Sequence, residues 1–201
     1  PYPLDTVNRS VYLWMDNYLM NVIVVDDFLP KPEFDVLHDL LMGETDEASP
    51  ESFQWRVNMT GSPPAGDTTQ AEAEVCKYQI HTLFEAGHVS PWFEVFEPIL
   101  RNIESKLQFT IHELIRVRAN LYTNTGIPTA HPDHIDQSFP HAVAMFYINT
   151  CNGPTTINGT DYDCVANRMI LFDGEYRHHS NLQTDTKVRV NVNINITGAF
   201  R

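Results

Sequence analysis

The segment KVRVNVNINITG (187–198) alternates apolar and polar residues without interruption. Because successive side chains of a β-strand point to opposite faces, this pattern predicts one long strand with an apolar face and a polar face. The apolar face would carry Val188, Val190, Val192, Ile194 and Ile196, and the polar face Arg189, Asn191, Asn193, Asn195 and Thr197. Either the polar face lies in solvent, or helices cover the apolar face and the polar face lines the interior of a jelly roll.

The rest of the chain places helices before strands. A strand is expected within 21–30, helices over 31–43, 70–86 and 91–107, and strands over 115–122, 141–149 and 167–173. Residues 44–70 form a long irregular excursion, with a short strand at FQWRVNM (53–59). This order predicts an α+β fold in which an antiparallel sheet has its helices packed on one side.

The composition indicates a single domain of 201 residues, in which 1–110 supply a strand and supporting helices and 111–201 supply the strand-rich core. The formal net charge of −13 disfavours a nucleic-acid partner, since phosphate backbones need basic surfaces. No apolar stretch is long enough to span a membrane. The three widely spaced cysteines form neither a disulfide framework nor a zinc site, so we expect a reducing, cytoplasmic location.

The segment HPDHID (131–136) contains the pattern His-x-Asp twice. Two His and one carboxylate on one face are typical of non-haem iron sites, and a strand presents residues i and i+2 together. The two pairs have opposite parity, so both cannot face one site. Pro132-Asp133 fits a type I turn, which would start a strand at His134. This favours His134 and Asp136, with His131 at the pocket rim and His131/Asp133 as the alternative pair.

Further candidate ligands follow in FDGEYRHHSN (172–181), where His178 or His179 would complete the set. Arg189 lies eleven residues after His178 and presents a planar fork that matches a carboxylate. Tyr122, on the polar face of IRVRANLY (115–122), would donate its hydroxyl to the same carboxylate. Arg116, Arg118 and Asn120 share that polar face.

This ordered set resembles the iron(II)- and 2-oxoglutarate-dependent dioxygenases, close to the prolyl-4-hydroxylase-like branch. The resemblance spans roughly 112–198 and rests on RANLYTNTG, HPDHIDQ, MFYINTCNGPTTING, NRMILFDGEYRHHS and KVRVNVNIN. It implies a double-stranded β-helix, or jelly roll, with N-terminal helices packed on the major sheet. The implied reaction is hydroxylation of a substrate, with O₂ consumed and 2-oxoglutarate decarboxylated to succinate.

The resemblance also implies roles for individual residues. The pattern FDG-x-x-x-H favours His178 over His179 as a ligand. Fe(II) would be held by His134, Asp136 and His178, and 2-oxoglutarate by Arg189, Tyr122 and Asn120. O₂ would be the second cosubstrate and ascorbate an optional reductant.

The substrate is expected to be a peptide or a small molecule, with residues 44–70 as a lid or specificity loop. Two other functions are compatible with the same pattern. One is a jelly-roll binding module without catalysis, because a fold alone does not determine function. The other is a nucleic-acid demethylase, which Asn120-x-Tyr122 resembles and which the acidic composition disfavours.

Overall fold

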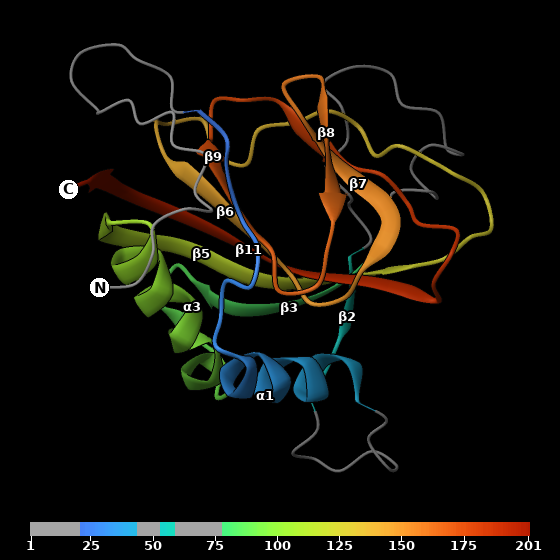
Figure 1. Ribbon diagram of the computed structural model, residues 1–201, viewed down its shortest axis with the longest axis horizontal. Helices are drawn as coiled ribbons and strands as arrows, with labels where there is room; N and C mark the ends of the chain where they lie inside the picture. Colours follow the sequence, from blue (N-terminus) through green and yellow to red (C-terminus); the bar gives the residue numbers. More distant parts are fainter. Residues whose placement is uncertain (1–20, 44–52, 59–77) are drawn as a thin grey trace.

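The computed structural model describes residues 21–43, 53–58 and 78–201. Most of them belong to two antiparallel sheets (Figure 1). The major sheet follows the order β1 (Ile23–Val25), β9 (Met169–Asp173), β6 (Ala142–Tyr147), β11 (Val188–Phe200), β5 (Phe109–Thr123), β3 (Tyr78–Glu85) and β2 (Arg56–Asn58), with β4 (His88–Val89) paired to β3. The minor sheet follows the order β10 (His178–Ser180), β7 (Cys151–Ile157) and β8 (Thr160–Cys164).

The two helices of the described residues cover one face of the major sheet. They are α1 (Lys31–Met42) and α3 (Phe93–Lys106), and Figure 1 shows them on the opposite side of β5 and β11 from β7 and β8. Each has buried residues at helical spacing, such as Leu37 and Leu41 in α1, so each is amphipathic. These residues pack with Val192 and Ile194 of β11 in one apolar core.

A second apolar core lies between the two sheets. It contains Val143 and Met145 of β6 together with Cys151 and Cys164 of the minor sheet. The major sheet is therefore packed on both faces, which explains the nearly continuous apolar sequence of β6 and its complete burial. Two sheets with helices on the outer face of one form the jelly roll that the sequence predicts.

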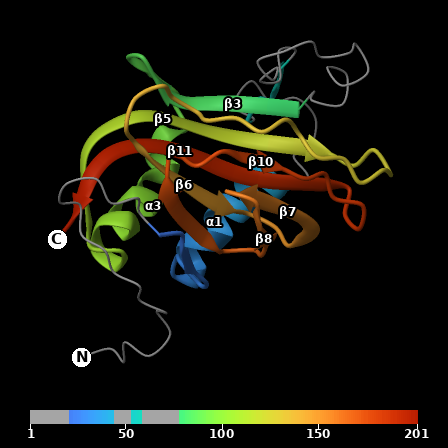
Figure 2. The ribbon, with the colours of Figure 1, turned by 90° about the horizontal axis from the view of Figure 1, so that it is seen from above.

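Strand β11 decides between the two interpretations of the alternating segment. It lies in the middle of the major sheet, between β6 and β5, and Figure 2 shows β3, β5 and β11 side by side. Its polar side chains are buried as fully as its apolar ones, with Arg189, Asn191 and Asn195 each 0% exposed. The polar face of β11 therefore lines the interior of the jelly roll and does not lie in solvent.

The helix predicted over 70–86 is wrong where the structure describes it, because residues 78–85 form β3. Tyr78, Ile80 and Thr82 alternate with other residues and have side chains that favour a strand. Pairing with β5 satisfies their backbone, and this long-range contact overrides the local pattern. Residues 70–77 and most of the excursion 44–70 lie outside the described residues, except that β2 supplies the short strand expected there.

The other predicted elements agree with the structure within a few residues, except that the strand expected over 115–122 begins six residues earlier, at Phe109 of β5. The strand expected within 21–30 is limited to β1, and the helices expected over 31–43 and 91–107 are α1 and α3. In the described ranges, neither helix has the length and apolar composition that crossing a membrane requires.

Candidate active site

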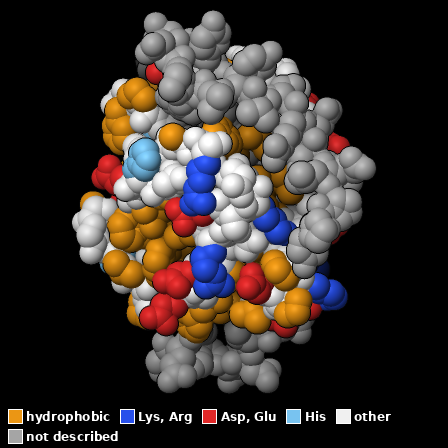
Figure 3. Space-filling model, turned by 60° about the vertical axis from the view of Figure 1, so that its left-hand side comes forward, with side chains coloured by type: hydrophobic (Ala, Val, Ile, Leu, Met, Phe, Trp, Pro, Cys, Tyr) orange, Lys and Arg blue, Asp and Glu red, His pale blue; other side chains and the backbone are white. Residues whose placement is uncertain are grey.

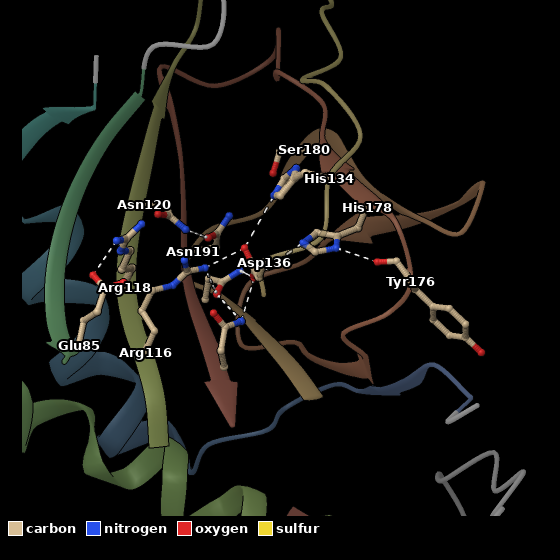
Figure 4. Close-up of polar contacts among 12 residues, drawn as sticks. Glu85, Arg116, Arg118, Asn120, His134, Asp136, Tyr176, His178, Ser180 and Asn191 are labelled. Carbon is tan, nitrogen blue, oxygen red and sulfur yellow. Dashed lines mark hydrogen bonds and ion pairs between the residues drawn. The ribbon is translucent and has the colours of Figure 1, made fainter. Parts of the chain in front are cut away.

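Three side chains converge in a pocket between the two sheets. His134, Asp136 and His178 each offer one ligand atom, and these atoms lie within 4.8 Å of one another (Figure 4). His178 begins β10, whereas His134 and Asp136 lie on the segment before β6. The structure thus groups the second His-x-Asp pair with His178.

The two imidazoles of this group have the same orientation relative to their backbones. Nδ1 of His134 lies 3.1 Å from the carbonyl oxygen of Pro132, and Nδ1 of His178 lies 3.1 Å from that of Tyr176. A proton on Nδ1 satisfies each carbonyl and leaves the Nε2 lone pair available. The Nε2 atoms of His134 and His178 lie 3.8 and 3.9 Å from the Asp136 carboxylate, on the same side of the pocket.

Asp136 is a buried carboxylate held by three neighbours. Nη2 of Arg116 lies 2.8 Å from Oδ1, and the side-chain amides of Asn193 and Asn195 donate to Oδ2 at 3.0 and 2.8 Å. Burial favours the neutral carboxyl, but Arg116, the two histidines and the Asn195 amide together outweigh it and hold the pKa of Asp136 well below its usual range. Asp136 is therefore ionised at neutral pH and fixed in orientation.

His178 is neutral under the same conditions. Burial lowers its pKa to about 4, although the neighbouring Asp136 acts in the opposite direction. Its Nε2 is buried and has no hydrogen-bond partner among the described residues. A neutral imidazole with an unused lone pair, beside an ionised carboxylate and a second imidazole, is a donor set that a divalent iron ion accepts.

The first His-x-Asp pair is divided. Asp133 points away from the pocket, and its Oδ1 lies 2.6 Å from Nδ1 of His179 in a partly exposed pair. Asp133 and His179 are therefore not part of the triad. His131 lines the pocket, in edge contact with the ring of Tyr122. The rim position predicted for His131 agrees with the structure, although strict alternation would have placed it on the opposite face.

No turn occurs at Pro132-Asp133, and the strand predicted to begin at His134 is reduced to a single bridge with His178. The segment runs beside residues 178–181, where the amides of His131 and His134 donate to Ser180 and His178. Pro132 lies between these two donors, at a position where the pairing needs no N–H. Proline is thus accommodated beside the strand without a turn.

The buried guanidinium of Arg189 lies on the polar face of β11, at the end of the strand away from the residues that contact Asp136. It lies 5.4 Å from the ring centre of Tyr122 and 5.6 Å from that of Tyr147, and its Nη2 donates to Thr155 at 2.7 Å. Its Nε and Nη1 have no hydrogen-bond partner, and no carboxylate of the described residues pairs with it. The ring of Tyr122 separates Arg189 from the pocket surface, which Tyr122 itself lines.

Asn120 also lines the pocket, as predicted, and donates to the side-chain oxygen of Asn191 at 2.9 Å. Tyr122 accepts a hydrogen bond from Ser180 at 3.4 Å and stacks on Tyr78. Burial raises the pKa of Tyr122 far above neutrality, so its hydroxyl stays protonated and can donate.

The arrangement of the chain matches solved structures of low sequence identity. A viral collagen prolyl hydroxylase from Paramecium bursaria Chlorella virus 1, in complex with 2-oxoglutarate, has a TM-score of 0.52 at 15% identity, covering 87% of this chain and 94% of that one. A Pseudomonas putida prolyl-4-hydroxylase has a TM-score of 0.51 at 16% identity, covering 90% and 92%. AviO1 from Streptomyces viridochromogenes Tue57 has a TM-score of 0.56 at 10% identity, covering 89% and 90%. The fold is that of the prolyl-hydroxylase-like 2-oxoglutarate oxygenases. No family model and no curated protein matches the sequence.

Within this oxygenase fold, the pocket includes residues to which the sequence assigned no role. Arg116 and Arg118 lie on the polar face of β5, and Asn193 lies opposite Arg118 on β11. Alternation in both strands places these side chains on the inner face, so their position was readable from the sequence. The contacts of Arg116 and Asn193 with Asp136 were not, because they join segments whose relative position depends on the whole sheet.

Proposed function

We propose that this protein is a non-haem Fe(II)- and 2-oxoglutarate-dependent dioxygenase that hydroxylates a peptide or a small molecule. The observation that carries the proposal is the convergence of His134, Asp136 and His178 in one pocket. Two imidazoles and one carboxylate leave the remaining positions of an octahedral ion open for a bidentate cosubstrate and for oxygen. The viral prolyl hydroxylase of similar fold was solved in complex with 2-oxoglutarate, which supports the choice of cosubstrate.

The protein's part in this chemistry is positioning. Iron, when bound, supplies the oxygen chemistry, and His134, Asp136 and His178 would hold it. Arg116 and the amides of Asn193 and Asn195 fix the Asp136 carboxylate, so its free lone pairs keep one direction. Burial keeps His178 neutral and therefore able to bind.

Arg189 would bind the distal carboxylate of 2-oxoglutarate, with the Tyr122 hydroxyl as a second donor. A fully buried guanidinium without a carboxylate partner is costly, and a bound anion would compensate its charge. The Nε and Nη1 donors have no hydrogen-bond partner among the described residues and are therefore available to an anion. Because the Tyr122 ring covers Arg189, we expect this ring to turn aside on binding. Asn120 would line the same cosubstrate pocket.

The described part of the face in Figure 3 gives no support to a nucleic-acid substrate. On the described part of the face in Figure 3, Lys and Arg side chains lie apart from one another among acidic and hydrophobic ones, without a continuous basic patch. With a net charge of −13, this arrangement offers no path for a phosphate backbone. A peptide or a small molecule remains the proposed substrate class.

The test combines metal content with cosubstrate turnover. Purified protein is loaded anaerobically with Fe(II), and we expect one iron per chain and succinate formation from 2-oxoglutarate only when O₂ is admitted. Ascorbate is included as a reductant. A protein that binds no iron at micromolar concentrations, and forms no succinate, would contradict the proposal. A folded protein whose metal content does not depend on His134 and Asp136 would instead support a binding module that works without metal.

A further inference from the structure

Two arginines, Arg116 and Arg118, lie on the opposite side of Asp136 from the two histidines. Arg116 and Arg118 are two residues apart on β5, so their side chains share the inner face, and both line the pocket (Figure 4). Neither is required by the proposed cosubstrate site, where Arg189 binds the distal carboxylate. In a protein with twice as many acidic as basic residues, two further arginines in one pocket need a physical reason.

The two arginines differ in their partners. Arg118 has a carboxylate of its own, because its Nη2 lies 2.6 Å from Oε2 of Glu85 on β3. The only carboxylate that Arg116 contacts among the described residues is Asp136, which is also a proposed iron ligand. Its contact with Asn193 is long, at 3.5 Å. The buried Nε has no partner among the described residues in either arginine, so the two differ in their carboxylates.

The charges of the loaded site do not cancel. The positive charges counted are the guanidiniums of Arg116, Arg118 and Arg189. The negative charges are the carboxylates of their partners Glu85 and Asp136. A divalent ion and the dianion 2-oxoglutarate cancel each other, so one positive charge is left over. Since 2-oxoglutarate satisfies Arg189 and Glu85 satisfies Arg118, that charge belongs to Arg116. Its side chain is only 12% exposed, so water compensates it poorly.

We infer that Arg116 is a specificity-determining residue that binds a carboxylate of the primary substrate. This inference rests on the proposed function and narrows its substrate class to organic acids, that is, compounds with a free carboxylate close to the carbon that reacts. Nη2 of Arg116 contacts Asp136 of the triad and its Nε has no partner among the described residues, so an acid group bound to this guanidinium would be held beside the metal. A neutral substrate of the same shape would leave this charge unpaired and would be rejected.

The experiment uses acetate and acetamide, which have nearly the same shape and differ in charge. The full chain is loaded with Mn(II), whose unpaired electrons accelerate the relaxation of nearby protons, and is saturated with 2-oxoglutarate. Methyl-proton relaxation of each probe is then titrated. We expect a saturable enhancement for acetate at least about fivefold larger than for acetamide, since charge-assisted hydrogen bonds are much stronger than neutral ones.

Variants assign the effect to one residue. Arg116→Gln is expected to reduce acetate affinity about tenfold or more, Arg116→Lys to retain part of it, and the matched control Arg118→Gln to retain most of it. Mn(II) affinity is measured for each variant first, and the probes are compared at saturating metal. Equal enhancement by acetate and acetamide in the unmodified protein overturns the inference, whatever the variants do.

Two other results also overturn it. Acetate enhancement that is unchanged in Arg116→Gln means that acetate binds the metal directly or at another site. Acetate enhancement that disappears when 2-oxoglutarate is added means that Arg116 binds the cosubstrate. Failure of the proposed function is distinguishable from all of these, because the protein would then bind neither Mn(II) at the triad nor 2-oxoglutarate before any probe is added.

Discussion

His134 and His178 are backbone partners as well as neighbours in the pocket. The N–H of each donates to the carbonyl oxygen of the other, at 3.1 and 2.9 Å, and their ring centres lie 4.6 Å apart. Two residues 44 positions apart are thus held in register by the same kind of bond that joins strands. The imidazole pair belongs to the framework of the jelly roll, and we expect it to be in place before any metal binds.

Asp136→Asn should abolish metal binding, whereas Asp133→Asn should not. Loss of an outer partner of a metal ligand typically costs about 10–100-fold in affinity, so loss of the charged ligand itself should cost more than about 100-fold. Asp133 contacts His179 outside the triad, so its replacement should change affinity less than about threefold. Mn(II) titration followed by electron paramagnetic resonance measures both. Similar losses in the two variants would point to the first His-x-Asp pair.

Arg189→Met should weaken the binding of 2-oxoglutarate without lowering the stability of the ligand-free protein. The methionine cannot bind a carboxylate, so we expect 2-oxoglutarate affinity to fall by at least about 100-fold. Replacing a buried, unpaired charge with an apolar side chain is often neutral or stabilising, so the unfolding temperature without ligand should stay the same or rise. Calorimetric titration and thermal unfolding provide the two measurements. A large loss of stability with retained affinity would show that Arg189 has a structural role.

His131 should make the metal-free protein less stable in acid. Burial, assisted by the charge of Arg189, lowers its pKa from 6.5 to about 4 in the folded state. Between these two values the unfolded chain takes up a proton that the folded chain does not, so the free energy of unfolding falls as the pH falls. The decrease is complete near pH 4 and amounts to at most about 3 kcal/mol, since one pKa unit corresponds to about 1.4 kcal/mol.

The variant His131→Gln cannot take up this proton, so its stability should fall less over the same window. Denaturant unfolding in the presence of a chelator, at several pH values between about 7 and 4, compares the two proteins. Other groups titrate equally in both, so the difference between the curves reports His131. Parallel curves would contradict the prediction.

Gly174→Ala should destabilise the protein more than Gly159→Ala. A Cβ at Gly174 would overlap the buried ring of His141, which packs directly on this glycine. We expect a loss of about 2 kcal/mol or more, as for other overpacked core positions. A Cβ at Gly159 meets open space, and its cost, about 1 kcal/mol, comes from the positive φ of +78°. Denaturant unfolding of both variants tests this order.

Alternation was the reliable signal in the sequence. It located β11 and β5 and separated their buried polar residues from the core, because a strand has only two faces. The grouping of His134, Asp136 and His178 was also anticipated, by favouring the second His-x-Asp pair. The reasoning behind that choice was partly wrong, since Pro132 lies beside a strand and not in a turn.

Other features were missed for identifiable reasons. Strands β7 and β8 form a hairpin whose turn, Asn158-Gly159, has positive φ at both residues, as the pattern Asn-Gly predicts. The Asn-Gly signal is present in the sequence, but the polar residues around it hide the alternation of the two flanking strands. Strand β3 could not be recognised locally, because it is specified by its pairing with β5. The ion pair of Arg116 with Asp136 depends in the same way on contacts between distant segments.

One face of β11 lines the pocket and the other packs in the apolar core, so the register of this strand fixes both at once. A shift of this strand by one residue would move Arg189 and Asn191 into the apolar core and place Val190 and Val192 in the pocket. An insertion or deletion within β11 that no β-bulge absorbs would exchange the two faces, so we expect divergence of this pocket to proceed by substitution on the inner face or by changes in the loops around it. Among relatives, the spacing from His178 to Arg189 can vary only in the loop 181–187, before the strand begins.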